Sequence, residues 1–106
     1  MIMKNIETLK DTYRYLIGGY YGVREMDEYN LKEYVLKDIL DYIDSYFQQY
    51  PIPNFDYKKE ASKVEEELSL VTKLQDALLV LPKVNAPMEL IFLVKQKIKK
   101  CKDDKQ

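Results

Sequence analysis

Acidic residues recur at short intervals in the middle of the chain, in the stretch NLKEYVLKDILDYIDSYFQQY of residues 30–50. On a helix the acids fall opposite the apolar residues and are bordered by two tyrosines. This predicted face comprises Glu33, Tyr34, Asp38, Asp41, Tyr42 and Asp44. Between residues 25 and 44 the chain has seven acidic residues and only two lysines. The pattern therefore marks a concentrated negative charge on one helix.

Three kinds of chemistry could use these carboxylates. A hard cation such as Ca²⁺ needs six or more converging oxygen ligands, and one helix face cannot converge them. General acid catalysis needs a carboxyl group with a raised pKa, which nothing nearby in the sequence indicates. Tyrosines among carboxylates are typical of protein interfaces. We therefore predict a docking face for a protein with a basic surface; a solvated helix face is the alternative.

The composition narrows the function further. The chain contains no histidine, which excludes serine-histidine and cysteine-histidine catalytic pairs and the usual zinc sites. Its single cysteine, Cys101, cannot form an internal disulfide. The sequence has no long apolar span that would cross a membrane. We expect a cytoplasmic protein that is not an enzyme and has no cofactor, metal site or membrane partner.

A second pattern surrounds the glycines near residue 20. All ten tyrosines lie in the first 57 residues, and Tyr20 and Tyr21 stand between Gly19 and Gly22. The Gly18-Gly19 pair is expected to interrupt a helix. Tyr20 and Tyr21 would then form an exposed recognition loop or pack within a tight one. The run lacks the Gly-Lys-Ser/Thr ending of a phosphate-binding loop.

The spacing of apolar residues predicts four helices. Asn5 would cap the first helix, and Asn30 with Glu33 would form a capping box for the second. Asn54 or Asp56 would cap the third helix, which Pro82 ends. The predicted helices cover residues 4–17, 31–50, 57–81 and 87–101.

Four helices joined by short connections predict an all-α fold, a compact bundle of about four antiparallel helices or a related orthogonal array. Residues 1–102 would form a single helical domain, and residues 103–106 would form a short polar tail. The alternative is an α+β fold with a small hairpin around residues 12–25, because TYRYLI and YYGVRE flank a Gly-Gly pair.

The fourth predicted helix has two unlike halves. Its first half, MELIFLV, is apolar nearly all round and is expected to be the most buried segment of the chain. Its second half, KQKIKKCKDDK, is basic. These lysines could solubilise the C-terminus, contact nucleic-acid phosphates, or pair with the acidic helix of a neighbouring copy in a homodimer. A net charge of -1 removes the simplest argument for a general nucleic-acid binder.

These patterns favour a small non-enzymatic helical interaction protein of the inhibitor or immunity type, which binds a protein partner through the acidic, tyrosine-bearing face. The composition, rich in Lys, Ile and Tyr and without Trp, suggests a bacterial or phage origin. The alternative function is a nucleic-acid-associated regulator that uses the lysine-rich C-terminal helix.

Overall fold

The computed structural model describes residues 5–103, and every regular element in that range is helical. The elements are α1 (Ile6–Arg24), α2 (Lys32–Gln49), α3 (Tyr57–Glu67), α4 (Leu70–Val80), the 3-10 helix η1 (Leu81–Val84) and α5 (Met88–Asp103). The predicted all-α fold is confirmed, and the hairpin around residues 12–25 is wrong, because these residues lie mostly in α1. The predicted first helical residue, residue 4, and tail residues 104–106 lie outside the described residues, while Asp103 belongs to α5.

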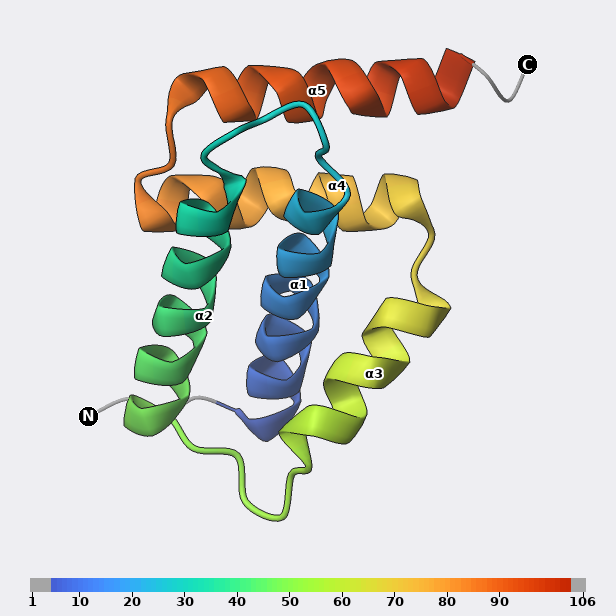
Figure 1. The fold of residues 1–106 in the computed structure, drawn as a ribbon. Coiled ribbons are helices and arrows are strands. Elements are labelled where there is room, and N and C mark those ends of the chain that lie inside the picture. Colours follow the sequence, from blue (N-terminus) through green and yellow to red (C-terminus); the bar gives the residue numbers. More distant parts are fainter. Residues whose placement is uncertain (1–4, 104–106) are drawn as a thin grey trace.

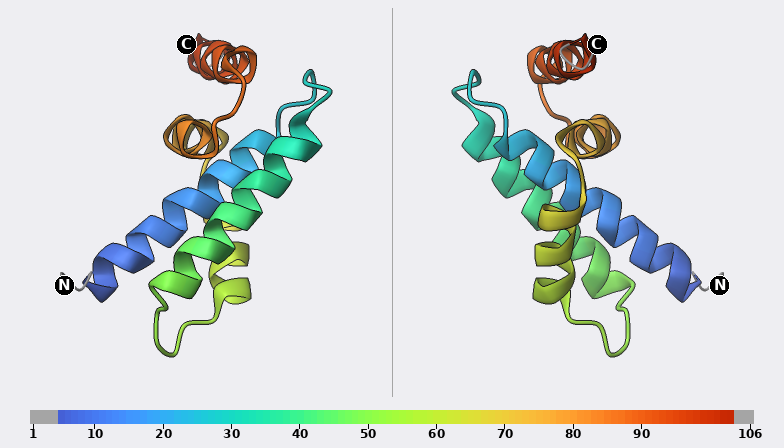
Figure 2. Two further views of the ribbon diagram at one scale, coloured as in Figure 1. Left: turned by 90° about the vertical axis from the view of Figure 1, so that its left-hand side faces the viewer. Right: turned by 90° about the vertical axis from the view of Figure 1, so that its right-hand side faces the viewer.

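The helices form two groups that cross each other. α1 and α2 lie side by side and antiparallel, and α3 lies on the other side of α1 (Figure 1). α4 crosses the end of this group, and α5 runs back along α4 on its outer side (Figure 1). With α4 and α5 seen end-on, α1 and α2 run across the view (Figure 2). α1 and α2 have the antiparallel packing of the predicted bundle, and the crossing of the two groups matches the related orthogonal array (Figures 1 and 2).

Two of the predicted helix caps are present and one is not. Asn5 Oδ1 accepts a hydrogen bond from the backbone N–H of Glu7 at 2.7 Å, and Asp56 Oδ1 accepts one from that of Lys59 at 3.1 Å. These bonds satisfy backbone donors that a helix start leaves without partners. The predicted capping box of Asn30 is wrong, because α2 begins at Lys32 and its cap residue Leu31 makes no side-chain cap bond.

The third predicted helix is divided in two. The chain is extended at Leu68, with φ -81° and ψ 137°, so α3 ends there. Ser69 Oγ then accepts a hydrogen bond from the backbone N–H of Thr72 at 3.2 Å and starts α4. The spacing of apolar residues does not reveal this break, because it continues unchanged across Leu68. The result is five α-helices in the described chain instead of the four predicted.

The glycines near residue 20 lie inside α1 and do not end it. All three are buried, and none has a positive φ. A Cβ atom at Gly19 would lie 2.6 Å from Val80 Cγ2, and one at Gly22 would overlap the carbonyl oxygen of Lys73. The missing side chains therefore let α4 cross directly against α1. The predicted interruption of the helix is wrong because a small residue can serve close helix packing as well as a turn.

An aromatic cluster at the opposite end of α1 connects α1, α2 and α3. The Tyr13 ring lies edge-on to the rings of Phe47 at 5.5 Å, Phe55 at 5.3 Å and Tyr57 at 5.2 Å between centroids. The Tyr13 hydroxyl donates a hydrogen bond to the backbone oxygen of Tyr57 at 2.8 Å. Edge-to-face rings add stability beyond their buried area. Much of the N-terminal concentration of tyrosines is thus structural.

α5 is a peripheral helix, and the prediction that MELIFLV is the most buried segment is wrong. Leu90, Val94 and Ile98 form its buried stripe, but Met88 is 75% exposed and Phe92 is 58% exposed. Lys97 turns inward, and its Nζ donates a hydrogen bond to the backbone oxygen of Glu25 at 2.6 Å. Apolar composition predicts burial only where a second element covers each face, and in the described chain α4 and the loop after α1 cover one face of α5.

Candidate functional site

The outer face of α2 is the strongest candidate for a binding site. Its inner face is fixed by Val35, Ile39 and Ile43, which are buried. At 3.6 residues per turn the acidic residues must then point outward. We define the acidic face of α2 as the exposed residues Glu33, Tyr34, Asp38, Asp41 and Asp44. Tyr34 is 73% exposed, although its ring is large and partly apolar.

The structure separates the acidic face into two edges. Asp38 and Asp41 border a shallow depression of about 320 Å³ that is also lined by Tyr42, Ser45, Lys83 and Val84. Asp44 instead borders an apolar groove of about 280 Å³ over α1, beside Phe47 and Tyr57. The sequence placed these three carboxylates together on one face. In the folded chain only Asp38 and Asp41 share a depression.

No carboxylate of the acidic face forms an ion pair with a described residue. Carboxylates of α3, in contrast, are paired with arginines of α1. Arg14 pairs with Glu60 at 3.8 Å and with Glu67 at 3.2 Å, both on α3. Arg24 pairs with Glu65, also on α3, at 3.6 Å. The negative charge of α3 is therefore partly neutralised by α1, while that of α2 faces solvent. A surface of this kind attracts a positively charged partner.

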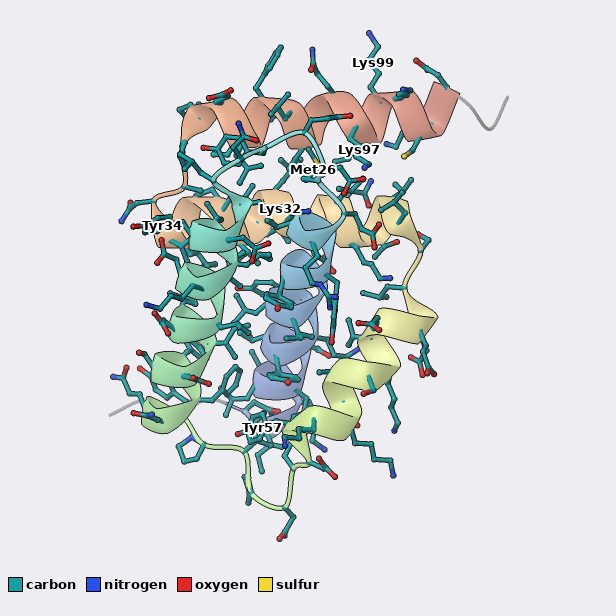
Figure 3. All side chains as sticks on the ribbon, in the orientation of Figure 1. Met26, Lys32, Tyr34, Tyr57, Lys97 and Lys99 are labelled. Carbon is teal, nitrogen blue, oxygen red and sulfur yellow. The ribbon has the colours of Figure 1, made fainter. Side chains whose placement is uncertain are left out.

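Tyr42 and Tyr34 have different roles. Tyr42 is half-buried and stacks on Tyr46, with ring centroids 6.1 Å apart and planes 27° apart. Tyr34 extends from the start of α2 (Figure 3) and is close to Leu31, which is 53% exposed. Leu31 was missed because it lies just before the apolar stripe that defined the helix. A predicted start of this helix at Lys32 would have indicated that Leu31 is exposed.

Tyr20 and Tyr21 do not belong to this face. They are half-buried residues of α1, so the predicted recognition loop is wrong. The Arg24 guanidinium lies 5.6 Å from the centre of the Tyr21 ring. Burial, followed by the nearby Glu65 carboxylate, raises the pKa of Tyr21 above its ordinary value. Glu65 belongs to α3, and Tyr21, Arg24 and Glu65 line one depression between α1 and α3.

One half-buried carboxyl group was not singled out in the sequence. Asp76, on α4, is half-buried against Gly18, where a Cβ atom would lie 2.5 Å from Asp76 Oδ2. Burial raises the pKa of Asp76 to about 6. No described residue forms a hydrogen bond or an ion pair with this carboxylate. In the sequence, the apolar neighbours Leu74 and Ala77 would have indicated that Asp76 is partly buried.

The groups with shifted pKa values lie on α1 and α4 and not on the acidic face of α2. Burial, followed by the nearby Tyr21 and Tyr57, raises the pKa of Tyr13 to about 12, and Tyr13 lies in the aromatic cluster. Within residues 5–103 no group of three or more cysteine or acidic side chains could hold a metal ion. None of the described helices is both long and apolar enough to span a membrane.

The chain matches no protein-family model, no curated protein and no solved structure.

Proposed function

We propose that this chain is a small non-enzymatic interaction protein, of the inhibitor or immunity type, that binds a basic surface of a protein partner through the acidic face of α2. The observation that supports it most is the combination of Asp38 and Asp41 without ion pairs and Tyr34 at 73% exposure on one helix face. The fold does not need these side chains, because the buried residues of α2 lie on its other face.

The chemistry of the face suits a protein surface better than a small ligand. The depression beside Asp38 is shallow and open, whereas small-molecule sites bury most of their ligand in a concave pocket. Tyrosine supplies a large contact area with little conformational freedom to lose, and exposed carboxylates steer a cationic partner during encounter. Leu31 and Tyr34 would form the apolar part of the contact and Asp38 and Asp41 its charged part.

Binding is favoured over catalysis by the placement of the perturbed groups. Tyr13, Tyr21 and Asp76 each have a raised pKa caused first by burial, and they lie on α1 and α4 and not on α2. A catalytic site brings such groups together around a reacting atom. The acidic face of α2 contains none of the three.

Reversing the charge of the acidic face is expected to abolish partner binding without unfolding the protein. The variant Asp38→Lys with Asp41→Lys should lower recovery of the partner by about tenfold or more when tagged protein is used to capture it from an extract of the cells that express it. Both side chains are exposed, so the melting temperature should change little.

The matched control is Asp11→Lys with Glu66→Lys, which makes the same change of net charge on α1 and α3. Asp11 and Glu66 are also exposed. Full recovery by this control and loss by the α2 variant would support the proposal. Equal recovery of every specific partner by both variants would refute it.

A further inference from the structure

α5 carries an exposed stripe with the opposite charge to that of α2. Met88, Phe92, Lys95, Lys99 and Lys102 fall within about 80° of one another around the helix axis at 100° per residue. All five are exposed, and the buried residues Leu90, Val94 and Ile98 lie on the other side of the helix. The structure shows Lys99 directed away from the bundle, while Lys97 points inward (Figure 3). We call these five residues the α5 stripe.

The lysines of the α5 stripe have no ion pair among the described residues, and the stripe contains no acidic residue. Lys97 is different, because its ammonium group is bonded to the backbone oxygen of Glu25. Among the described lysines of α5, Lys97 therefore bonds to the rest of the fold, whereas the three lysines of the α5 stripe and Lys100 are exposed. The outward lysines follow two exposed apolar side chains, Met88 and Phe92.

The same order of residue types occurs on α2. Leu31, Tyr34, Asp38 and Asp41, which we call the α2 stripe, begin with two exposed apolar side chains and continue with two carboxylates. The aromatic ring and the second charge are seven residues apart in each stripe, which is about 10.5 Å along a helix. Lys37 and Asp44 lie on one flank of the α2 stripe.

We infer that the α5 stripe binds the α2 stripe of a second copy of this chain. With the two helices parallel, Met88 and Phe92 would meet Leu31 and Tyr34, while Lys95 and Lys99 would meet Asp38 and Asp41. Apolar contacts and opposite charges coincide in this register, and the antiparallel register would place rings against charges. The inference rests on the proposed function, because it names one partner with the basic chemistry that the acidic face fits.

The contact forms between copies and not within one. α5 packs on α4 and on the loop after α1, and it crosses at a large angle to α2 (Figures 1 and 2). Each copy contributes one α2 stripe and one α5 stripe. Two such contacts close a symmetric dimer if the rotation between copies is twofold, and otherwise they extend into a chain of copies.

Self-association of the purified full chain tests the inference. Light scattering at low salt should show a mass above that of the monomer that rises with concentration and falls towards the monomer at about 0.5 M salt, where charges are screened. Lys95→Glu with Lys99→Glu, and separately Asp38→Lys with Asp41→Lys, should each weaken association by about tenfold or more. Asp11→Lys with Glu66→Lys should leave association unchanged.

The decisive experiment mixes the two charge-reversed variants, Lys95→Glu with Lys99→Glu and Asp38→Lys with Asp41→Lys. Each variant alone presents stripes of like charge and should be monomeric. Together they should associate as the original protein does, because each stripe again meets one of opposite charge. A wild-type monomer at every concentration tested, or a mixture that stays monomeric, would overturn the inference.

Other occupants of the α5 stripe would give different results. Sedimentation of the wild-type monomer with phosphatidylglycerol vesicles, or a salt-sensitive shift of duplex DNA, lost in Lys95→Glu with Lys99→Glu, would assign the stripe to an anionic surface and overturn the inference. Loss of partner capture by the α2 variant of a strictly monomeric protein would leave the proposed function standing and remove only self-association.

Discussion

Replacing Gly22 with alanine is expected to destabilise the protein by about 2 to 3 kcal/mol, even though alanine is the better helix former by about 1 kcal/mol. The new Cβ atom would overlap the backbone carbonyl of Lys73. A backbone carbonyl inside a helix cannot rotate away, so α1 and α4 must move apart where they cross. Separation would open the packing of buried residues such as Leu74 and Val80.

The matched control is Gly18→Ala, the same substitution one turn earlier in α1. Its Cβ atom would lie 2.5 Å from Asp76 Oδ2 and 3.1 Å from Leu68 Cδ1, both ends of side chains that can move. We expect a change within about 1 kcal/mol. Thermal unfolding should therefore show a melting temperature lower by about 10 °C or more for Gly22→Ala and little change for Gly18→Ala. Equal effects at both positions would contradict the close approach of α4 at Gly22.

Replacing Asp76 with asparagine is expected to stabilise the protein at neutral pH. The folded protein holds the pKa of Asp76 at about 6, against an ordinary value of 3.8, because burial disfavours the charged carboxylate. The difference corresponds to about 3 kcal/mol, and solvent screening of a half-buried group reduces the expected gain to about 1 to 2 kcal/mol. Asparagine keeps the shape of the side chain and has no charge to bury.

The direction of the pH effect follows from proton binding. Between about pH 4 and pH 6 the folded state binds a proton at Asp76 that the unfolded state has lost, so this group makes the protein less stable as the pH rises. This destabilisation by the charged Asp76 carboxylate is absent below about pH 4 and complete above about pH 6 to 7. Asp76→Asn should therefore exceed the wild type in free energy of unfolding at pH 7.5 and match it near pH 4.

Urea unfolding of both proteins across this range measures the difference and cancels the titration of the other carboxyl groups. Glu66→Gln on α3 is the control, because its carboxylate is exposed and the same loss of one charge should have little effect at any pH. An Asp76→Asn variant no more stable than the wild type at pH 7.5 would show that its carboxylate has solvent or another partner.

The helices themselves could be predicted because each has a local cause. The caps Asn5 and Asp56 and the stop at Pro51 are set by neighbouring residues, and the apolar stripe of α2 repeats with the helical period. The burial of Gly18 and Gly19 inside α1 could not be predicted in this way. It depends on α4, which is about 60 residues away in the sequence and fills the space that the glycines leave.

The candidate site could likewise be predicted only where its features have a local cause. The outward direction of Asp38 and Asp41 follows from the buried residues of α2 alone, and the structure agrees. The separation of Asp44 onto the groove edge and the half-burial of Tyr42 depend on α1 and Tyr46, which no pattern within α2 can reveal. The exposure of Phe92 likewise depends on which elements cover α5.

Photo-crosslinking in cells tests most directly whether the acidic face of α2 is a binding surface. A photoreactive amino acid in place of Tyr34 is expected to give a discrete crosslinked product with a protein partner, whether a second copy or another chain. The same amino acid in place of Glu66 on the exposed side of α3 should not give that product. The absence of a crosslink at position 34, or the same products at both positions, would contradict the proposed function.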